Sequence, residues 1–233
     1  MVNINDSIMK RHTLIRKLSR DIDQVTRPHP VRVAIDGIDN AGKTTLAEEL
    51  TQKLQKKHCS IIRASIDGFH HPRKKRYTKG KLSPAGYYYR SFNHEALKEK
   101  LLKPLGPNGD LKYIKAVFDF RNDSLVSEKI HKAKRNAILL FDGVFLFRPE
   151  LNDHWDFRIF VHVSFETALE RALLRDRILF GSSEETRKRY LERYIPGQKI
   201  YLKKVDPKHK ADIIIDNNDP THPLILMGTG INF

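Results

Sequence analysis

The segment that could bind phosphate is Gly37-Ile38-Asp39-Asn40-Ala41-Gly42-Lys43-Thr44, which fits the pattern G-x-x-x-x-G-K-[ST]. Glycines at this spacing let the backbone turn tightly, so that successive amide N–H groups point at one anion. The lysine would then reach the terminal phosphates of a nucleotide, and the threonine hydroxyl would ligate Mg²⁺. The residues that we predict to bind the nucleotide are Gly37, Asn40, Ala41, Gly42, Lys43, Thr44 and Thr45.

Two aspartates follow apolar segments of the strand type. Asp67 comes after residues 60–66, and Asp142 comes after the run Ala137-Ile138-Leu139-Leu140-Phe141. The carboxyl ends of strands in a parallel sheet line the ligand crevice. We therefore predict that Asp142 and Thr44 hold Mg²⁺, whereas Asp67 accepts or orients the proton of an acceptor hydroxyl.

The elements that must position these residues alternate regularly along the chain. Strands are expected at 31–36, 60–66, 137–141, 158–163 and 211–216, with a weaker one at 113–118. Helices are expected at 6–24, about 43–57, 94–102, from Ser164 onward, and from Ser182 to Tyr194, where Pro196-Gly197 would end the helix. This alternation predicts an α/β fold with a mostly parallel sheet and helices on both faces. Without a repeat or a long linker, residues 1–233 should form a single domain with an N-terminal helical extension at 1–30.

The composition excludes several classes of protein. Of the 233 residues 39% are hydrophobic, which is too many for a disordered chain. A single cysteine, Cys59, excludes a disulfide framework and a cysteine-rich metal site. No stretch approaches the roughly 20 apolar residues of a membrane span. Residues Met1 to Ser7 lack the apolar run of a signal peptide, so we expect a cytoplasmic protein.

Positive charge is concentrated in one segment. The formal net charge is +15, and the stretch from Gly68 to His94 contains no acidic residue but seven basic ones. Such a balance suits an anionic partner, which could be nucleic acid, a lipid surface or a phosphorylated small molecule. The segment 68–93 follows Asp67, so we expect it to fold over the acceptor site; a purely solvated role stays open.

Taken together, these motifs resemble the P-loop kinases that include uridine kinase, phosphoribulokinase and bacterial pantothenate kinase. The resemblance spans residues 31–216. It is carried by the phosphate loop, Asp67-Gly68-Phe69-His70, Ser83-Pro84-x-Gly86-Tyr87-Tyr88, Phe92-Asn93-His94, Val117-Phe118-Asp119, Asp142-Gly143-Val144-Phe145, Arg171 to Arg177, and Arg193-Tyr194-x-Pro196-Gly197-Gln198. It implies a three-layer P-loop kinase fold with a small lid, and ATP-dependent phosphorylation of a hydroxyl on a small molecule.

The resemblance also assigns roles to individual residues. Asp67 matches the catalytic acid, and Lys43, Arg171 and Arg175 would complete the catalytic set, with the two arginines on a lid at about 171–195. An arginine fork suits the spread charge of a phosphoryl group. The residues expected to bind the acceptor are Asp67, His70, Arg73, Tyr88, Phe92, Asn93 and Phe118.

The acceptor itself is left open by two departures from uridine kinases. Those enzymes have Phe-Asp-His where this chain has Phe92-Asn93-His94, and their base-reading histidine is absent after Phe118-Asp119-Phe120. A nucleoside or related metabolite is the first expectation, and another small alcohol or a sugar phosphate is the second.

A different class, a nucleic-acid-associated P-loop NTPase, is also compatible with the charge. The chain has no recognisable RNA- or DNA-binding module, and its basic run lies beside Asp67 and does not form a tail. We therefore expect ATP, Mg²⁺ and a small hydroxyl-bearing acceptor as ligands, no nucleic acid and no membrane, with a homo-oligomer left open.

Overall fold

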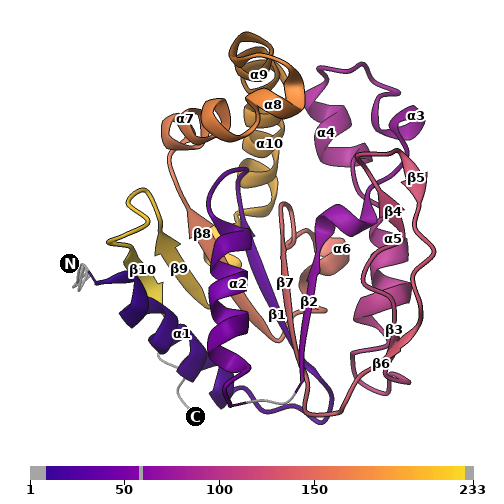
Figure 1. Ribbon diagram of the computed structural model, residues 1–233, viewed down its shortest axis with the longest axis vertical. Coiled ribbons are helices and arrows are strands. Elements are labelled where there is room, and N and C mark those ends of the chain that lie inside the picture. Colours follow the sequence, from indigo (N-terminus) through magenta and orange to yellow (C-terminus); the bar gives the residue numbers. More distant parts are fainter. Residues whose placement is uncertain (1–8, 58–59, 229–233) are drawn as a thin grey trace.

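A six-stranded sheet forms the centre of the computed structural model, which describes residues 9–57 and 60–228 (Figure 1). The strand order is β10-β9-β8-β1-β7-β2. The strands are β1 (Val31–Gly37), β2 (Ile61–Ser65), β7 (Ile138–Gly143), β8 (Phe157–His162), β9 (Ile213–Asp216) and β10 (Leu224–Gly228). The first five are parallel to one another, and β10 pairs antiparallel with β9. The predicted mostly parallel sheet is confirmed.

The central position of β1 explains its composition. Every residue of β1 is buried, because β7 and β8 flank it and helices cover both faces of the sheet. In its register Ile35 lies beside Asp142 of β7, and Gly37 lies beside Val161 of β8. The phosphate loop and Asp142 therefore emerge at the same edge of the sheet.

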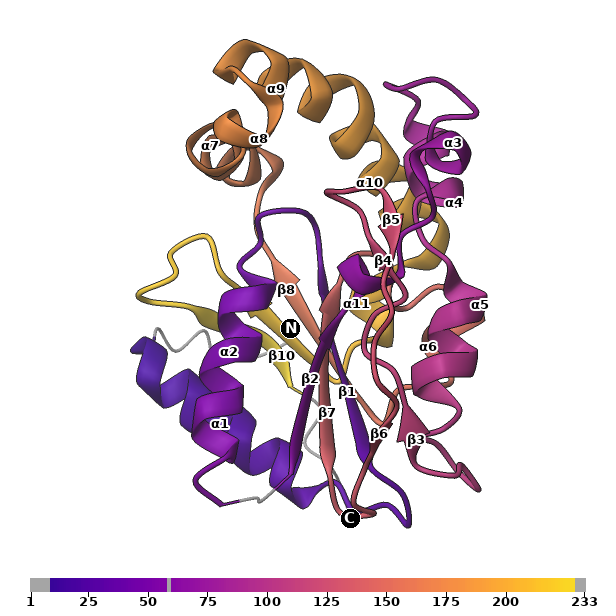
Figure 2. The same ribbon diagram turned by 45° about the vertical axis from the view of Figure 1, so that its right-hand side comes forward.

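Helices form the outer layers (Figures 1 and 2). Helices α1 (Arg11–Gln24) and α2 (Lys43–Leu54) pack on one face, over an apolar cluster that includes Leu18, Leu46 and Val33. The opposite face packs against a cluster that includes Leu101, Phe145 and Tyr201. The remaining helices and helical turns are η1 (Ile66–Phe69), α3 (Arg73–Arg76), α4 (Pro84–Arg90), α5 (His94–Leu97), η2 (Lys98–Leu102), α6 (Pro149–Asn152), α7 (Phe165–Arg175), α8 (Arg177–Phe180), α9 (Ser183–Arg189), η3 (Tyr190–Tyr194), α10 (Ile195–Val205) and α11 (Pro207–Lys210).

The predicted strand at 113–118 is wrong. Two short antiparallel strand pairs occur in this region: β3 (Lys112–Tyr113) with β6 (His131–Lys132), and β4 (Phe118–Asp119) with β5 (Ser124–Leu125). The residues between β3 and β4 bond elsewhere, because the Lys115 and Ala116 amides both donate to the Glu128 carboxylate and the Val117 amide donates to the Gly68 carbonyl. Their backbone groups are thus not available to continue one strand.

The predicted helix end at Pro196-Gly197 is also wrong, since η3 runs directly into α10. Pro196 lies in the first turn of α10, where a missing N–H is tolerated. A Cβ on Gly197 would lie 2.8 Å from Cδ1 of Tyr87, so the glycine lets α10 approach α4 closely.

Other expectations change in detail. The basic segment 68–93 contains the end of η1 and the helices α3 and α4, and β10 was not predicted. Met1 to Ser7, Cys59 and residues 229–233 lie outside the described residues. Among the helices of the described part, none is long and apolar enough to cross a membrane.

Candidate active site

The phosphate loop joins β1 to α2, as predicted, and two of its glycines cannot be replaced without displacing neighbours. A Cβ on Gly37 would lie 2.3 Å from the Val161 carbonyl oxygen of β8. Gly42 has a φ of +90°, and its Cβ would lie 2.6 Å from Nδ2 of Asn217. The loop is thus packed tightly against the carboxyl ends of β8 and β9.

Lys43 begins α2 and is turned into the loop. Its side chain is buried, and its Nζ donates to the Ile38 carbonyl oxygen at 2.6 Å. Burial lowers the pKa of the ammonium group, and the charges of Asp39, Asp142 and other nearby carboxylates oppose that shift. The amino group of Lys43 therefore lies at the position where this loop would receive an anion.

Thr44 and Asp142 lie in direct contact. The Thr44 hydroxyl donates to Oδ2 of Asp142 at 2.6 Å, and Arg63 of β2 forms an ion pair with Oδ1 of Asp142 at 2.7 Å. A hydroxyl and a carboxylate are oxygen ligands of the type that Mg²⁺ prefers. Within the described residues no three His, Cys, Asp or Glu side chains are grouped to hold a metal, so an ion here needs further oxygens from a bound phosphate or water.

Asp67 lies in η1, just beyond the end of β2. Its side chain is 61% exposed, and it faces the cavity that the phosphate loop borders. The surrounding residues displace water from this carboxyl group, which raises its pKa. The negative charge of Asp142 raises the pKa further. Asp67 thus stands free to receive a ligand group, unlike Asp142, whose oxygens have partners in Thr44 and Arg63.

His70 forms an aromatic wall of the same cavity. Its ring centre lies 4.5 Å from that of Phe92 and 4.7 Å from that of Phe120. Burial lowers the pKa of the ring to about 4, so it is neutral near pH 7. Its Nδ1 is 3.0 Å from the Asp67 carbonyl oxygen. Because that carbonyl can only accept, Nδ1 carries the proton and Nε2 is a hydrogen-bond acceptor.

Asp39 is a loop residue whose role the sequence reasoning missed, although it lies inside the motif. Its Oδ2 accepts hydrogen bonds from the Tyr87 hydroxyl of α4 at 2.8 Å and from Nε2 of Gln198 of α10 at 2.5 Å. Burial raises the pKa of this carboxyl group, while the charge of Lys43 lowers it. Asp39 therefore joins the phosphate loop to the opposite helical layer.

Arg175 takes part in a chain of contacts with the phosphate loop. Its guanidinium binds both oxygens of Asp176, at 2.6 and 3.2 Å. The Tyr190 hydroxyl donates to Oδ2 of Asp176 and accepts from Nδ2 of Asn40, both at 2.7 Å. The sequence reasoning missed Asp176 and Tyr190, which together connect the predicted lid region to the loop.

Arg171 is held at the other side of the loop. Its guanidinium donates to the carbonyl oxygens of Asn40 at 3.2 Å, Asn217 at 2.8 Å and Asn218 at 3.0 Å. Asn217 follows β9 directly, so the rule that ligands lie beyond the carboxyl ends of parallel strands was the signal that could have found it.

Two adjoining cavities meet at these residues. The first, of about 190 Å³, is lined by eight predicted site residues, namely Asn40, Lys43, Thr44, Asp67, His70, Phe92, Asp142 and Arg175. The second, of about 340 Å³, is lined by Arg11, Asn40, Gly42, Thr45, Glu49, Arg171, Arg175, Asn217 and Pro220. Asn40 and Arg175 line both cavities, which places the phosphate loop between them.

Four of the residues predicted to bind the acceptor do not line the first cavity. The backbone N–H of Arg73 donates to Asp123, and its guanidinium donates to the Arg121 carbonyl oxygen. Phe118 is buried in β4, and Phe120 of the same segment forms the cavity wall instead. These contacts hold the segment 68–93 against the hairpin that carries Phe120.

The other two of these four residues, Tyr88 and Asn93, also have contacts within the protein. Tyr88 packs against Phe145, with ring centres 5.3 Å apart, and the guanidinium of Arg148 lies 4.3 Å from its ring centre. Oδ1 of Asn93 accepts a hydrogen bond from the Ala96 amide and so caps the N-terminus of α5. The structure gives no support to a contact of either residue with the acceptor. The predicted loop residues Gly37 and Ala41 line neither cavity and contribute backbone only.

The sheet order, the phosphate loop and the strand-end aspartates define a P-loop kinase. Residues 32–221 match the model of the Phosphoribulokinase / Uridine kinase family, and the chain belongs to this family. Two known proteins that are similar to this chain are named as kinases of uridine. The chain is similar to uridine-cytidine kinase B of Dictyostelium discoideum, with 28% identity over 80% of this chain and 74% of the relative. It is also similar to a uridine kinase of Bacillus pumilus, with 25% identity over 88% of this chain and 95% of the relative.

Solved structures show the same fold. A structure from Bacillus stearothermophilus described as a possible uridine kinase has a TM-score of 0.69 and 22% identity, over 87% of this chain and 97% of that one. D-glycerate 3-kinase from Cryptococcus neoformans has a TM-score of 0.51 and 14% identity, over 80% of this chain and 85% of that one. The predicted P-loop kinase fold is confirmed.

Proposed function

We propose that this kinase transfers the γ-phosphoryl group of ATP to a hydroxyl of a nucleoside. The observation that carries this proposal is the first cavity. Asp67 lines it together with Lys43, Thr44 and Asp142, and the rings of His70, Phe92 and Phe120 also line it. The relatives named as uridine kinases support a nucleoside acceptor. A cytoplasmic location, self-association and the single domain at 1–233 stay predictions.

ATP would lie across the two cavities. Its phosphates would occupy the loop amides beside Lys43, and its base and ribose would enter the second cavity, which Thr45 and Arg171 line. Thr44 and Asp142 would hold Mg²⁺, which neutralises phosphate charge when it is bound. Arg175 lines both cavities, so its guanidinium would lie close to the phosphates of ATP, whose negative charge it would offset.

Asp67 would act on the acceptor. A bond forms between the acceptor oxygen and the γ-phosphorus, the bond from that phosphorus to the β–γ bridging oxygen breaks, and ADP leaves. The hydroxyl proton goes to the Asp67 carboxylate. Since the pKa of Asp67 is raised, the rate should fall on the acid side at a higher pH than an ordinary carboxylate would give.

The walls of the cavity favour a neutral, planar acceptor. Phe92 and Phe120 line the cavity and pack against the His70 ring, whose Nε2 can accept a hydrogen bond from a base. Among the described residues that line this cavity, none belongs to the seven basic residues of segment 68–93. Arg76 is instead paired with Asp123 at 3.3 Å. A nucleoside thus fits the cavity better than a sugar phosphate.

The decisive experiment measures transfer of labelled γ-phosphate to nucleosides by the wild type and by Asp67→Asn. The amide keeps the size of the side chain but cannot take the proton, so kcat should fall by roughly 10²–10⁴-fold. ATP binding measured by calorimetry should stay near wild type, because Lys43, Thr44 and the loop amides are intact. A matched control is Asp153→Asn, an exposed aspartate outside both cavities, which should keep wild-type kcat. Transfer to no nucleoside, with transfer to another alcohol, would refute the nucleoside acceptor.

A further inference from the structure

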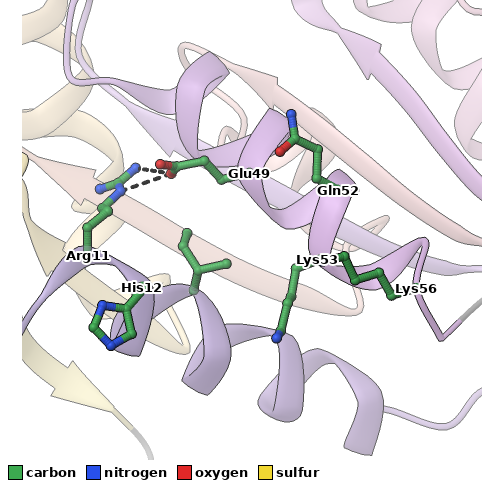
Figure 3. Close-up of a pocket in the computed structure, with 7 residues that line it drawn as sticks. Arg11, His12, Glu49, Gln52, Lys53 and Lys56 are labelled. Atoms are coloured by element: carbon green, nitrogen blue, oxygen red, sulfur yellow. Dashed lines mark hydrogen bonds and ion pairs between the residues drawn. The ribbon is translucent and has the colours of Figure 1, made fainter.

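Helix α1 lies outside the residues that match the family model, yet it reaches the nucleotide side of the molecule. Its first residue, Arg11, donates through Nε and Nη2 to one carboxylate oxygen of Glu49 on α2, at 2.9 and 2.6 Å. Figure 3 shows this pair at one end of the groove between α1 and α2. The Arg11 amide also donates to the Thr221 carbonyl oxygen at 3.2 Å. Hydrogen bonds thus hold both the guanidinium group and the backbone of Arg11.

A third contact joins Arg11 to the phosphate loop through one buried amide. Nη1 of Arg11 donates to Oδ1 of Asn217 at 2.9 Å, and Nδ2 of Asn217 donates to the Ala41 carbonyl oxygen at 2.7 Å. Asn217 is only 2% exposed. Because a guanidinium can only donate and a carbonyl can only accept, only one orientation of the Asn217 amide satisfies both partners. Arg11 and the Ala41 carbonyl therefore hold the Asn217 amide in the same orientation.

The same asparagine holds Arg171. Its backbone carbonyl accepts from Nη2 of Arg171 at 2.8 Å, and a second guanidinium nitrogen of Arg171 donates to the Asn40 carbonyl. Arg11, Asn217 and Arg171 all line the second cavity, beside Gly42 and Thr45. Arg11 of α1 thus supports Asn217 directly and Arg171 through Asn217, on the nucleotide side of the loop.

We propose that Arg11 is a positioning residue for the nucleotide, acting through Asn217 on the phosphate loop. The proposal rests on the proposed function, because it takes the second cavity as the place of the nucleotide base and ribose. Arg11 should therefore determine the affinity for ATP and leave the affinity for the acceptor unchanged, since it does not line the first cavity.

The test is calorimetric measurement of ATP binding to the full chain carrying Arg11→Met or Arg11→Lys. Methionine keeps the bulk of the side chain but leaves Oδ1 of the buried Asn217 without its donor, so the Kd for ATP should rise on the order of tenfold. Lysine keeps the charge but cannot bind Glu49 and Asn217 with one fork, so its Kd should also rise. The acceptor KM should stay within twofold of wild type in both variants.

The matched control is Lys57→Met. Lys57 follows α2 and forms an ion pair with Asp23 of α1 at 2.8 Å, so this variant also removes one positive charge and one contact between the same two helices. Because this ion pair is more exposed than the contacts of Arg11, the variant should lower thermal stability less than Arg11→Met does, and it should keep the wild-type Kd for ATP. Equal loss of ATP affinity in the two variants would show that Arg11 only holds α1 in place.

A double-mutant cycle with Asn217→Ala completes the test. If Arg11 acts through Asn217, Arg11→Met should have no further effect on the Kd for ATP once Asn217 is alanine. Additive effects would overturn the proposed route. If the wild type binds ATP and Arg11→Met binds it equally well, the proposed role of Arg11 is refuted and the proposed kinase function is not. If the wild type binds no ATP, the proposed function fails.

Discussion

Four aspartates surround Lys43, and their surroundings give each a different chemistry. Asp142 is bound by Thr44 and Arg63, whereas Asp39 is bound by Tyr87 and Gln198. Asp67 is open to the cavity. Asp36 is fully buried in β1 and accepts from the Tyr201 hydroxyl and the Leu146 amide. Of the four, Asp67 is the one placed to take a proton from a ligand.

Asp36 should make the stability of the protein depend on pH. Burial raises the pKa of its carboxyl group from 3.8 to about 6. Since the folded form binds the proton more tightly than the unfolded form, the stability that this group contributes is complete below pH 3.8 and is lost as pH rises through about 6. The uncharged variant Asp36→Asn should therefore gain on the order of 1 kcal/mol relative to wild type between about pH 5 and about pH 7.5.

Urea denaturation at the two pH values measures this difference. A second variant, Tyr201→Phe, removes a donor that favours the charged form of Asp36, so it should move the pH dependence to higher pH. A difference in unfolding free energy between Asp36→Asn and wild type that is the same at both pH values would contradict the prediction.

At the scale of elements, the region from α7 to η3 is fastened to the phosphate loop by few polar contacts. Tyr190 of η3 is the central one, because its hydroxyl lies between Asn40 of the loop and Asp176 at the end of α7. Helix α9 begins with a capping contact, in which the Ser182 hydroxyl accepts from the Glu185 amide as its sequence predicts. The region is locally well formed. Arg171 joins its first helix, α7, to the loop, and Tyr190 joins the part that follows α7.

Removing that hydroxyl should loosen the region without unfolding the sheet. In Tyr190→Phe the buried Asn40 amide loses its acceptor, at a cost of about 1–3 kcal/mol. Hydrogen exchange of α8 and α9 should become faster while exchange of α2 stays unchanged, and the KM for ATP should rise several-fold. The control is Tyr89→Phe on the half-exposed ring of α4, which should change neither quantity. Unchanged exchange in α8 and α9 would refute this role of Tyr190.

At the scale of the whole molecule, the net charge of +15 should attract polyanions without serving the reaction. Single-stranded RNA should bind to the wild type at about 50 mM salt and dissociate by about 200 mM, as expected for binding by phosphate contacts alone. RNA should not stimulate ATP hydrolysis, because the active-site cavity is lined by residues suited to a small acceptor. Filter binding and ADP release measure the two quantities. RNA-stimulated hydrolysis that persists at the higher salt would favour the nucleic-acid-associated NTPase.

The sequence alone determined the features that arise within one short segment. The phosphate loop is one, because Gly42 needs a left-handed conformation and the next residue begins a helix. The buried strands are further features of this kind, because their continuous apolar runs must be buried between two layers of helices. Thr44, Asp67 and Asp142 were found for the same reason, since each stands at the end or beginning of a predicted element.

Only the tertiary structure decided which distant residues complete the site. Asn217 reaches Ala41 across 176 positions, and Tyr190 reaches Asn40 across 150. No local pattern specifies these pairs, because they depend on the order of strands in the sheet and on how α1 and η3 are placed around it. The same cause explains Asn93, whose hydrogen-bonding side chain could serve a ligand or a helix end; in the folded chain it caps α5. The local sequence of a segment determines which chemical groups it can offer, whereas the packing of the whole chain determines which distant residues those groups contact.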